Sequence, residues 1–499
     1  MSSLLLSLCI FSPLIGVLCL LFIRKEEQRF IQMAGIISTL IPLLCASVIA
    51  ILYRFGTSLK AFSVKVDWIQ FGRFPGLEKD YFSIHYELGI DGFSLVMLVL
   101  TALLVTLSGI AGLSIEKNMK GFYILLLLLE VGMLGVFAAE NLLLFFIFFE
   151  LTLPAMFLLI GKWGKFSSEK AAYHYLIYNG IGSAILLIAF SILFAKTGTT
   201  NIGELANIIA EQASPFGEMG KTLQFNLFLA IMIAFAIKLP VFPLHRWMVS
   251  VHTEAHPAVV MLHAGILLKI GAYGMVRFGV GLFPEQFQNV SICIAILGVV
   301  NLLYGAFLAF IQRDFRSVLA YSSISHMGIV LLGLAAFNMS GMMGALFQII
   351  SHGLIAALLF FLLSMIEQRF GTSHLDQLGG LAKEVPVLSG FLLAGSMAAL
   401  GLPGMSGFIS EFLAFLGLFE VQPIVAVIGA LGIILTAVYM LRAALQVTFG
   451  KKKWSKTEDV RGIEYVPILV LLACIVIIGT MPNILSTPLN ETLQLIGGW

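Results

Sequence analysis

Six ionisable side chains lie inside long apolar stretches of the sequence, where they could load and release protons. They are Glu150, Lys238, Lys269, His326, His352 and Glu411. Glu150, for example, ends the run NLLLFFIFFE and is followed by the apolar run LTLPAMFLLI. An ionisable group at bilayer depth costs about 2.5 to 3.5 kcal/mol on insertion scales. Each of the six is therefore a candidate functional group.

Lys238 and Glu150 are the strongest of these candidates. Lys238 lies in AFAIKLPVFP, and no loop is within reach of its side chain. A buried lysine needs a carboxylate or water beside it, because burial disfavours its charged form. An acid and a base that set each other's proton affinity would act as a proton switch. The alternative is that each polar group only locks the packing of helices, and for any single histidine this alternative has equal weight.

Two of the apolar stretches contain residues that interrupt helices. These residues are Pro240 and Pro243 in the first stretch, and Gly401, Pro403, Gly404 and Gly407 in the second. Unwound backbone at membrane depth is tolerated only where it is buried in protein or lines a wet cavity. Each interruption lies beside a charge, Lys238 or Glu411. This placement favours a transport site over glycines that merely allow close packing.

Redox, nucleotide and metal chemistry have little support in the residues. The five cysteines stand singly in apolar runs, without the CxxC spacing of zinc or iron–sulfur sites. GxGxxG, P-loop and HExxH motifs are missing from the sequence. A metal site is conceivable in LHRWMVSVHTEAHPAVVMLH, although Pro257 interrupts the helix; its four histidines are His245, His252, His256 and His263. We therefore expect neither a cofactor nor a metal on this chain.

The elements that position these residues must be membrane-spanning helices. Of the 499 residues, 59% are hydrophobic and only 11% are charged, and the mean hydropathy is +1.01, whereas a soluble domain carries about a quarter charged residues. A span needs about 20 apolar residues. The apolar runs predict fourteen helices, at 4–23, 31–53, 88–113, 120–138, 140–160, 172–195, 223–243, 256–276, 289–311, 317–336, 341–366, 386–417, 424–448 and 463–480.

The predicted fold is an all-α integral membrane protein of about 14 transmembrane helices. Helices four to eight and nine to thirteen form two inverted five-helix repeats, in which helices seven and twelve are broken. The second unit is inverted because an odd number of spans makes it begin on the opposite side. The chain then divides into an N-terminal three-helix segment with an outer loop (1–119), a first repeat (120–278), a second repeat (279–448) and a C-terminal inner loop with the last helix (449–499).

The loops indicate which side of the membrane each end faces. The loops on one side carry more than twice as many lysines and arginines as those on the other. The positive-inside rule then places both termini outside the plasma membrane of a bacterium. Only two connections are long: 54–87, where residues 64–69 alternate like a short strand, and 196–222, where 202–212 could form a surface helix. A net charge of +2 suggests no nucleic-acid partner.

The candidate residues lie in segments that resemble the antiporter-like proton-channel subunits of respiratory complex I, the type I NADH:quinone oxidoreductase. The segments are GIDGFSLVMLVLT (89–101), the Glu150 helix, AFAIKLPVFPLHRWMVSVHTEA (234–255), HAGILLKIGAYG (263–274), LAYSSISHMG (319–328), QIISHGLIAALLFF (348–361) and GLPGMSGFISEFLAFLG (401–417). Glu411 and the sequence HTEA resemble the subunit M, or chain 4, type, since sister subunits typically have lysine in place of Glu411. The chain departs from the family at His256, where proline is more usual, and at His263, where an aliphatic residue is more usual.

This resemblance implies a role for each candidate. Glu150 would modulate the proton affinity of Lys238, and Glu411 would be the exit-side proton site. A central polar axis between them would be continued by Lys269, His326 and His352. NADH, FMN, iron–sulfur clusters and quinone would be bound by partner subunits, and other membrane subunits, including neighbouring antiporter-like ones, would flank this chain in the lipid bilayer.

Each segment taken alone is shared with Mrp-type cation/proton antiporter subunits and membrane-bound hydrogenase subunits. A chain of either kind, without these redox partners, is therefore the alternative. A third possibility is a purely structural scaffold, in which the buried charges would be dispensable.

Overall fold

The computed structural model describes residues 2–71, 82–211, 219–451, 454 and 457–497. In this part of the chain, thirteen helices are long and apolar enough to cross a membrane. Two shorter helices in series, α16 (Pro386–Ala399) and α17 (Ser406–Val421), account for the fourteenth predicted span. The prediction of an all-α membrane protein with about fourteen spans is therefore confirmed.

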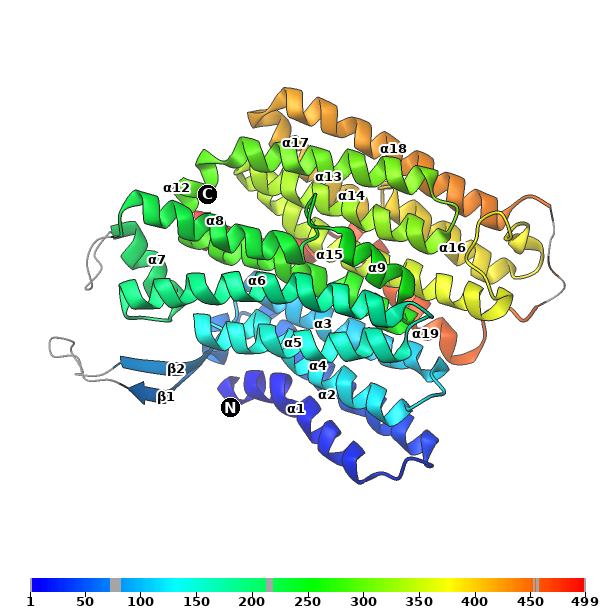
Figure 1. Cartoon of the computed structure of the whole chain (residues 1–499), viewed down its shortest axis with the longest axis horizontal. Helices are drawn as coiled ribbons and strands as arrows, with labels where there is room; N and C mark the ends of the chain where they lie inside the picture. The colour runs from blue at the N-terminus through cyan, green and yellow to red at the C-terminus, as the bar shows by residue number, and fades with distance from the viewer. Residues whose placement is uncertain (1, 72–81, 212–218, 452–453, 455–456, 498–499) are drawn as a thin grey trace.

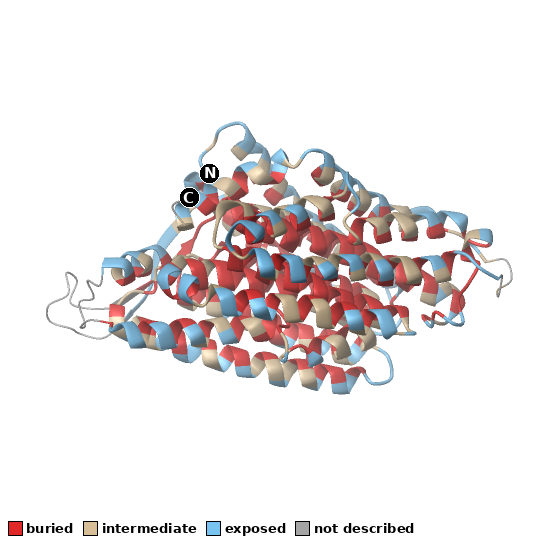
Figure 2. Ribbon diagram, turned by 90° about the horizontal axis from the view of Figure 1, so that it is seen from above, coloured by how far each residue is buried: buried red, intermediate tan, exposed pale blue. Residues whose placement is uncertain are grey.

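The long helices lie side by side along the horizontal axis of Figure 1. The continuous ones are α1 (Ser2–Phe22), α2 (Gln28–Arg54), α3 (Gly92–Ala111), α4 (Met119–Ala138), α5 (Leu142–Trp163), α6 (Ser168–Thr197), α8 (Lys221–Lys238), α13 (Ser291–Ile311), α14 (Phe315–Ala336), α15 (Met339–Phe370), α18 (Pro423–Thr448) and α19 (Tyr465–Thr480). One more span combines α10 (Pro257–Leu262), the π-helical segment η3 (His263–Leu267), α11 (Leu268–Gly274) and the π-helical segment η4 (Met275–Val280). Buried residues fill the centre of the bundle and exposed ones its outside (Figure 2).

Short polar side chains begin several of these helices. In each case a carboxylate or amide oxygen accepts a hydrogen bond from the main-chain N–H three residues later, which the first helical turn leaves without a partner. The residues are Asp91 for α3, Asn141 for α5, Asp314 for α14 and Asn338 for α15. These caps make the boundaries of the spans sharp where apolar residues alone would not.

The bundle has two different ends. The hairpin end carries the antiparallel strands β1 (Val64–Phe71) and β2 (Phe82–Leu88), together with α7 (Ile202–Glu211) and α12 (Pro284–Asn289). Both chain termini lie at this end (Figures 1 and 2). At the opposite end, which we call the basic end, Lys165 forms an ion pair with Glu367 and Arg369 with Glu464.

Three features differ from the sequence-based expectations. The third helix begins at Gly92 and not at 88, because residues 82–88 pair with β1. The span predicted at 223–243 stops at Lys238, and a separate helix α9 (Arg246–Glu254) follows. A further helix, α20 (Asn483–Gly497), lies beyond the last span. It was missed because only one of its faces is apolar, so the sequence shows no run of spanning length. The helix expected at 202–212 is confirmed as α7.

Candidate functional site

The first helix interruption lies directly after Lys238 and is buried in protein. Pro240 has a positive φ of 29°, so the chain leaves the helical path there. Asn301 of α13 satisfies the unwound backbone: its amide oxygen accepts from the Phe242 N–H at 2.6 Å, and its amide nitrogen donates to the carbonyl of Pro240 at 3.4 Å. Asn301 is completely buried. The break predicted from the prolines is therefore real, and a side chain from the other half of the bundle supports it.

The second interruption lies between α16 and α17 and contacts Glu411. Gly401 and Gly404 have φ values of 75° and 90°, a conformation that favours glycine. A Cβ atom at Gly401 would lie only 2.7 Å from Oε2 of Glu411. Glycine at this position therefore does two things: it allows the turn, and it leaves room for the carboxyl group. Glu411 itself is buried, with a side-chain exposure of 7%.

Two aromatic rings lie close to the buried side chain of Lys238. Its Nζ lies 4.8 Å from the ring centroid of Phe149 and 5.7 Å from that of Tyr175, distances at which a cation is attracted by the ring faces. Glu150 interacts electrostatically with Lys238 and with Tyr175, but among the described residues it forms no ion pair with the lysine. Its buried Oε1 atom has no hydrogen-bond partner in that part of the chain. The two groups are thus electrostatic neighbours and not a direct ion pair.

Lys269 and His352 meet at the centre of the bundle. Lys269 Nζ lies 2.7 Å from His352 Nδ1, and it also donates to the main-chain oxygen of Ala264 in η3. Their helices, Pro257–Val280 and α15, are the two spans whose most apolar stretch is wholly buried inside the described chain. This hydrogen bond therefore joins one helix from each of the two predicted five-helix units, and both of its side chains are buried.

The polar contacts continue from His352 to Glu411. The rings of His352 and His326 are 5.4 Å apart, and Nδ1 of His326 lies 3.6 Å from Oε1 of Glu411. Gln348 donates to the same Nδ1 atom at 3.1 Å and accepts from the hydroxyl of Ser410. The side chains of His326, Gln348, His352 and Glu411 line a cavity of about 10 Å³, which is about the room that one water molecule needs. The structure therefore gathers three titratable side chains, His352, His326 and Glu411, around a space of the size of one water molecule.

The structure brings together residues that the sequence left apart. His252 Nε2 lies 2.9 Å from His263 Nδ1, although a helix end and Pro257 separate the two in sequence. His245 instead packs against the rings of Phe242 and Tyr304. Among the described residues, no group of three or more His, Cys, Asp or Glu side chains is placed to hold a metal ion. Spacing alone could not have revealed the pair, because it depends on how the chain turns at 255–257.

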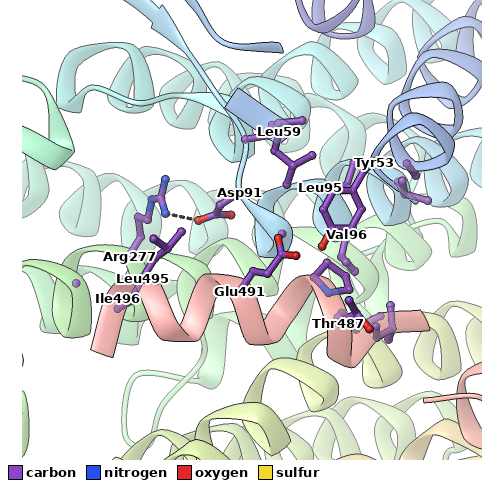
Figure 3. A pocket seen from close by; sticks show the side chains of 18 of the residues that line it. Tyr53, Leu59, Asp91, Leu95, Val96, Arg277, Thr487, Glu491, Leu495 and Ile496 are labelled. Atoms are coloured by element: carbon purple, nitrogen blue, oxygen red, sulfur yellow. Dashed lines mark hydrogen bonds and ion pairs between the residues drawn. The ribbon is translucent and has the colours of Figure 1, made fainter. Parts of the chain in front are cut away.

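A much larger cavity, of about 1,920 Å³, lies apart from the six candidates and near the hairpin end. Asp91 of α3 and Arg277 of η4 form an ion pair in its wall, and Glu491 of α20 points toward it (Figure 3). Loop residues 56–60 also line it. None of the six candidates lines this space.

Residues 139–436 match the model of a protein family described as "NADH:quinone oxidoreductase/Mrp antiporter, TM". The matched range contains both helix interruptions and all six candidates. The chain belongs to this family. Its membership agrees with the fold, because the matched range begins just after α4 and ends within α18.

Relatives within this family match most of the chain. NADH-quinone oxidoreductase subunit M of Rickettsia prowazekii is 34% identical over 485 residues, which cover 96% of this chain and 95% of the relative. NAD(P)H-quinone oxidoreductase chain 4 1 of a Synechococcus species is 40% identical over 420 residues, which cover 82% of this chain and 78% of the relative. The resemblance to antiporter-like subunits of the subunit M and chain 4 type is therefore confirmed.

Solved structures share the fold. A chain of respiratory complex I from Thermus thermophilus with bound NADH superposes with a TM-score of 0.87 at 28% identity, over 99% of both chains. A chain of the Mrp complex from Dietzia sp. superposes with a TM-score of 0.83 at 22% identity, over 99% of this chain and 98% of the other. The second likeness is one of fold only.

Proposed function

We propose that this chain is a proton-translocating membrane subunit of an NADH:quinone oxidoreductase. The observation that carries the proposal is the hydrogen bond between Lys269 and His352, because it connects two sets of buried titratable groups in the middle of a membrane protein. Buried ionisable groups that face a bundle interior are typical of proton pathways. The likeness to subunit M of Rickettsia prowazekii along 96% of the chain supports the same enzyme complex.

The proposed pathway begins at Lys238, whose proton affinity is set by Glu150. It continues through the centre at Lys269 and ends at Glu411. The intermediate groups are His352 and His326. In this second half Lys269 is hydrogen-bonded to His352, and a cavity of the size of one water molecule adjoins His352, His326 and Glu411.

Coupling along this pathway is electrostatic in our proposal. Charges in a low-dielectric interior interact strongly over several ångströms. Glu150 acts on Lys238, and Lys238 acts in turn on His263. A change of charge at one end therefore alters the proton affinity of the next group. Electron transfer takes place in partner subunits, which bind NADH, FMN, iron–sulfur clusters and quinone.

The two five-helix units are arranged, in this proposal, as inverted repeats. The fourth helix is interrupted in both units, after Lys238 in the first and between α16 and α17 in the second. These helices run in opposite directions. The first begins near the hairpin end, where Lys221 pairs with Glu285, and the second begins near the basic end, where Asp459 accepts from the Leu388 N–H. Interrupted helices at matching places are typical of transporters built on inverted repeats.

The orientation follows from the charges of the loops. We propose that the basic end faces the cytoplasm and that the hairpin end, with both termini, faces outward across a bacterial plasma membrane. Glu411 would then lie on the exit side of the pathway.

The partners of the chain provide the test of this function. Purification of the tagged protein from its own membranes should bring down a flavoprotein and a quinone-site subunit together with other antiporter-like subunits. Recovery of small hydrophobic antiporter subunits alone would contradict the proposal and favour a cation/proton antiporter. In the purified complex, Lys238→Ala and Glu150→Ala should each assemble and lose most proton pumping and the quinone reduction coupled to it.

A further inference from the structure

The large cavity near the hairpin end has an apolar floor, which α3 provides. Along residues 92–109 of this helix, every side chain or glycine is buried except Val96, Val99 and Leu103. These three residues are half-buried, and all of them line the cavity. Their spacing of three and four residues places them on one face of the helix. A helix that is otherwise enclosed by protein thus presents one apolar stripe to the cavity.

The sides of the cavity come from helices at the outside of the bundle. α2 and α19 both contribute lining residues, and most residues of these two spans are not buried within the bundle. α20 lies across the first turn of α3, where the Thr492 hydroxyl oxygen accepts from the Phe93 N–H at 2.9 Å. The cavity therefore lies at the surface of the membrane-spanning part, where a lipid can reach it.

The lining stops near the middle of the membrane. Its deepest residues on three spans, each near the middle of its helix, are Leu103 of α3, Leu354 of α15 and Cys474 of α19. From Gly92 to Leu103, α3 rises by about 17 Å, at about 1.5 Å per residue. The hydrocarbon core of a bilayer is about 30 Å thick, so the apolar stripe has about the depth of one leaflet. A spanning helix of a partner would need a groove through both leaflets, and this depth therefore favours the acyl chains of a lipid.

Unpaired charges of both signs lie at the mouth of the cavity. Arg54, at the end of α2, and Lys60, in the loop that follows, line it and are exposed. Glu491 extends from α20 toward the cavity (Figure 3), is exposed, and interacts electrostatically with Tyr53, the residue before Arg54. Within the described ranges of the chain, neither cation forms an ion pair with a carboxylate, and Glu491 forms none with a lysine or arginine.

The other charged residues of the lining have counter-charges within the chain. Arg277 pairs with Asp91 and attracts Glu140, and Glu285 pairs with Lys221. The charges at the mouth are therefore the ones available to a ligand. Arginine and lysine bind phosphate through charge-assisted hydrogen bonds, and a carboxylate binds an ammonium group in the same way.

We propose that the cavity binds a glycerophospholipid whose headgroup carries a phosphate and a primary ammonium group. The phosphate lies against Arg54 and Lys60, and the ammonium group lies against Glu491. The acyl chains cover the apolar stripe, which would be in unfavourable contact with water if water alone filled the cavity. The volume of about 1,920 Å³ is about twice the upper end of the range for drug-sized ligands, which suits a ligand with two chains.

The test places a photoreactive amino acid at Val99 of the chain in its native membrane complex. The complex is purified in detergent, washed extensively and then irradiated, and mass spectrometry identifies the adduct. We expect a phospholipid with an ethanolamine headgroup at Val99. The matched control is Ile428 of α18, which is 44% exposed and lies outside the cavity. There we expect detergent adducts, because lipid at an open surface exchanges with detergent. The subunits that copurify check that both variants assemble.

Two substitutions in the Val99 variant test recognition of the headgroup. Arg54→Gln and Glu491→Gln each remove one charge from the mouth. Each should lower the yield of the lipid adduct by about threefold, since an exposed ion pair contributes only modestly to binding. Arg24→Gln is the control, because Arg24 is equally exposed but does not line the cavity. This variant should give the same yield as the Val99 variant alone.

Three results overturn the proposal. Equal yields of lipid at Val99 and Ile428, or detergent at both, would show that the cavity holds no bound lipid. An adduct between Val99 and another protein chain would show that a partner subunit fills the space. An adduct yield that neither charge substitution lowers would show that the headgroup is not recognised and that the ligand is wrongly assigned. The readout is the adduct and not proton pumping, so failure of this proposal leaves the proposed function untouched.

Discussion

Three substitutions of Glu411 separate a proton site from a structural acid. Glu411→Gln keeps the shape of the side chain and removes its proton exchange. Glu411→Asp keeps the acid and shortens the side chain, and Glu411→Lys supplies a different titratable group. The three therefore vary shape and titration independently at a single position.

The geometry around His326 gives the expected sizes of these effects. Loss of one methylene group moves the carboxylate back by about 1.5 Å, which turns the observed 3.6 Å between Glu411 Oε1 and His326 Nδ1 into a gap of about 5 Å. One water molecule bridges such a gap with two hydrogen bonds of about 2.8 Å. The adjoining cavity of about 10 Å³, enlarged by the missing methylene, has room for it. Glu411→Asp should therefore keep a substantial part of the pumping rate.

Glu411→Gln should lose about a hundredfold or more, as removal of a general acid–base group does. Glu411→Lys should retain part of the rate. The assay is proton uptake into membrane vesicles driven by NADH, with reduction of an artificial electron acceptor as the control for assembly. If Glu411 only packs its helix, glutamine would be the mildest of the three substitutions, and that order would refute the reasoning.

Three further predictions concern the frame that holds the site. A cysteine at exposed Lys170 should react with an impermeant maleimide only from the cytoplasmic side, and labelling in intact cells would overturn the orientation. Gly344→Ala should destabilise the assembled subunit by about 1 to 3 kcal/mol, because the added Cβ atom would lie 2.2 Å from the main-chain nitrogen of Ala414. Gly180→Ala is the control: a Cβ atom at this position has no other atom within 4 Å, so the variant should have the melting temperature of the wild type. Burial raises the pKa of Glu140, which lies at the hairpin end, although the charge of Arg277 acts in the opposite direction. The contribution of Glu140 to the free energy of unfolding is therefore complete at a pH below the pKa of this residue in the unfolded chain. It is lost as the pH rises through the pKa of Glu140 in the folded protein. In Glu140→Gln, the melting temperature should therefore change less with pH over the range just above 4.5 than it does in the wild type. The same dependence of melting temperature on pH in both proteins would show that Glu140 does not titrate in this range.

The membrane fold could be predicted from the sequence because its signal is long and local. A run such as 341–366 contains enough apolar residues to identify α15 without any knowledge of its neighbours. The two interruptions could also be predicted, since proline and glycine act on their own backbone. In contrast, β2 depends on pairing with β1, and α20 depends on packing one apolar face, so neither is identified by its own residues alone.

The candidate site could be predicted only as a set of separate residues. A charge inside an apolar run is visible in the sequence, so Lys238, Lys269 and Glu411 stood out. The contacts between them depend on how α11, α15 and α17 pack, which no spacing reveals. The polar groups that connect them, such as Gln348, Ser410 and Asn301, look like ordinary packing residues until their partners are known.

The measurement that tests the central claim most directly is proton translocation by the assembled Lys269→Met complex. Methionine keeps a flexible chain of similar length and removes the charge, the proton and the hydrogen bond to His352. The number of protons moved into vesicles and the rate of quinone reduction would be measured together, with NADH oxidation by an artificial acceptor as the control for assembly. If protons cross the centre of this chain, both should fall to a small fraction of the wild-type values while the control stays normal. Wild-type proton translocation in an assembled Lys269→Met complex would contradict the account.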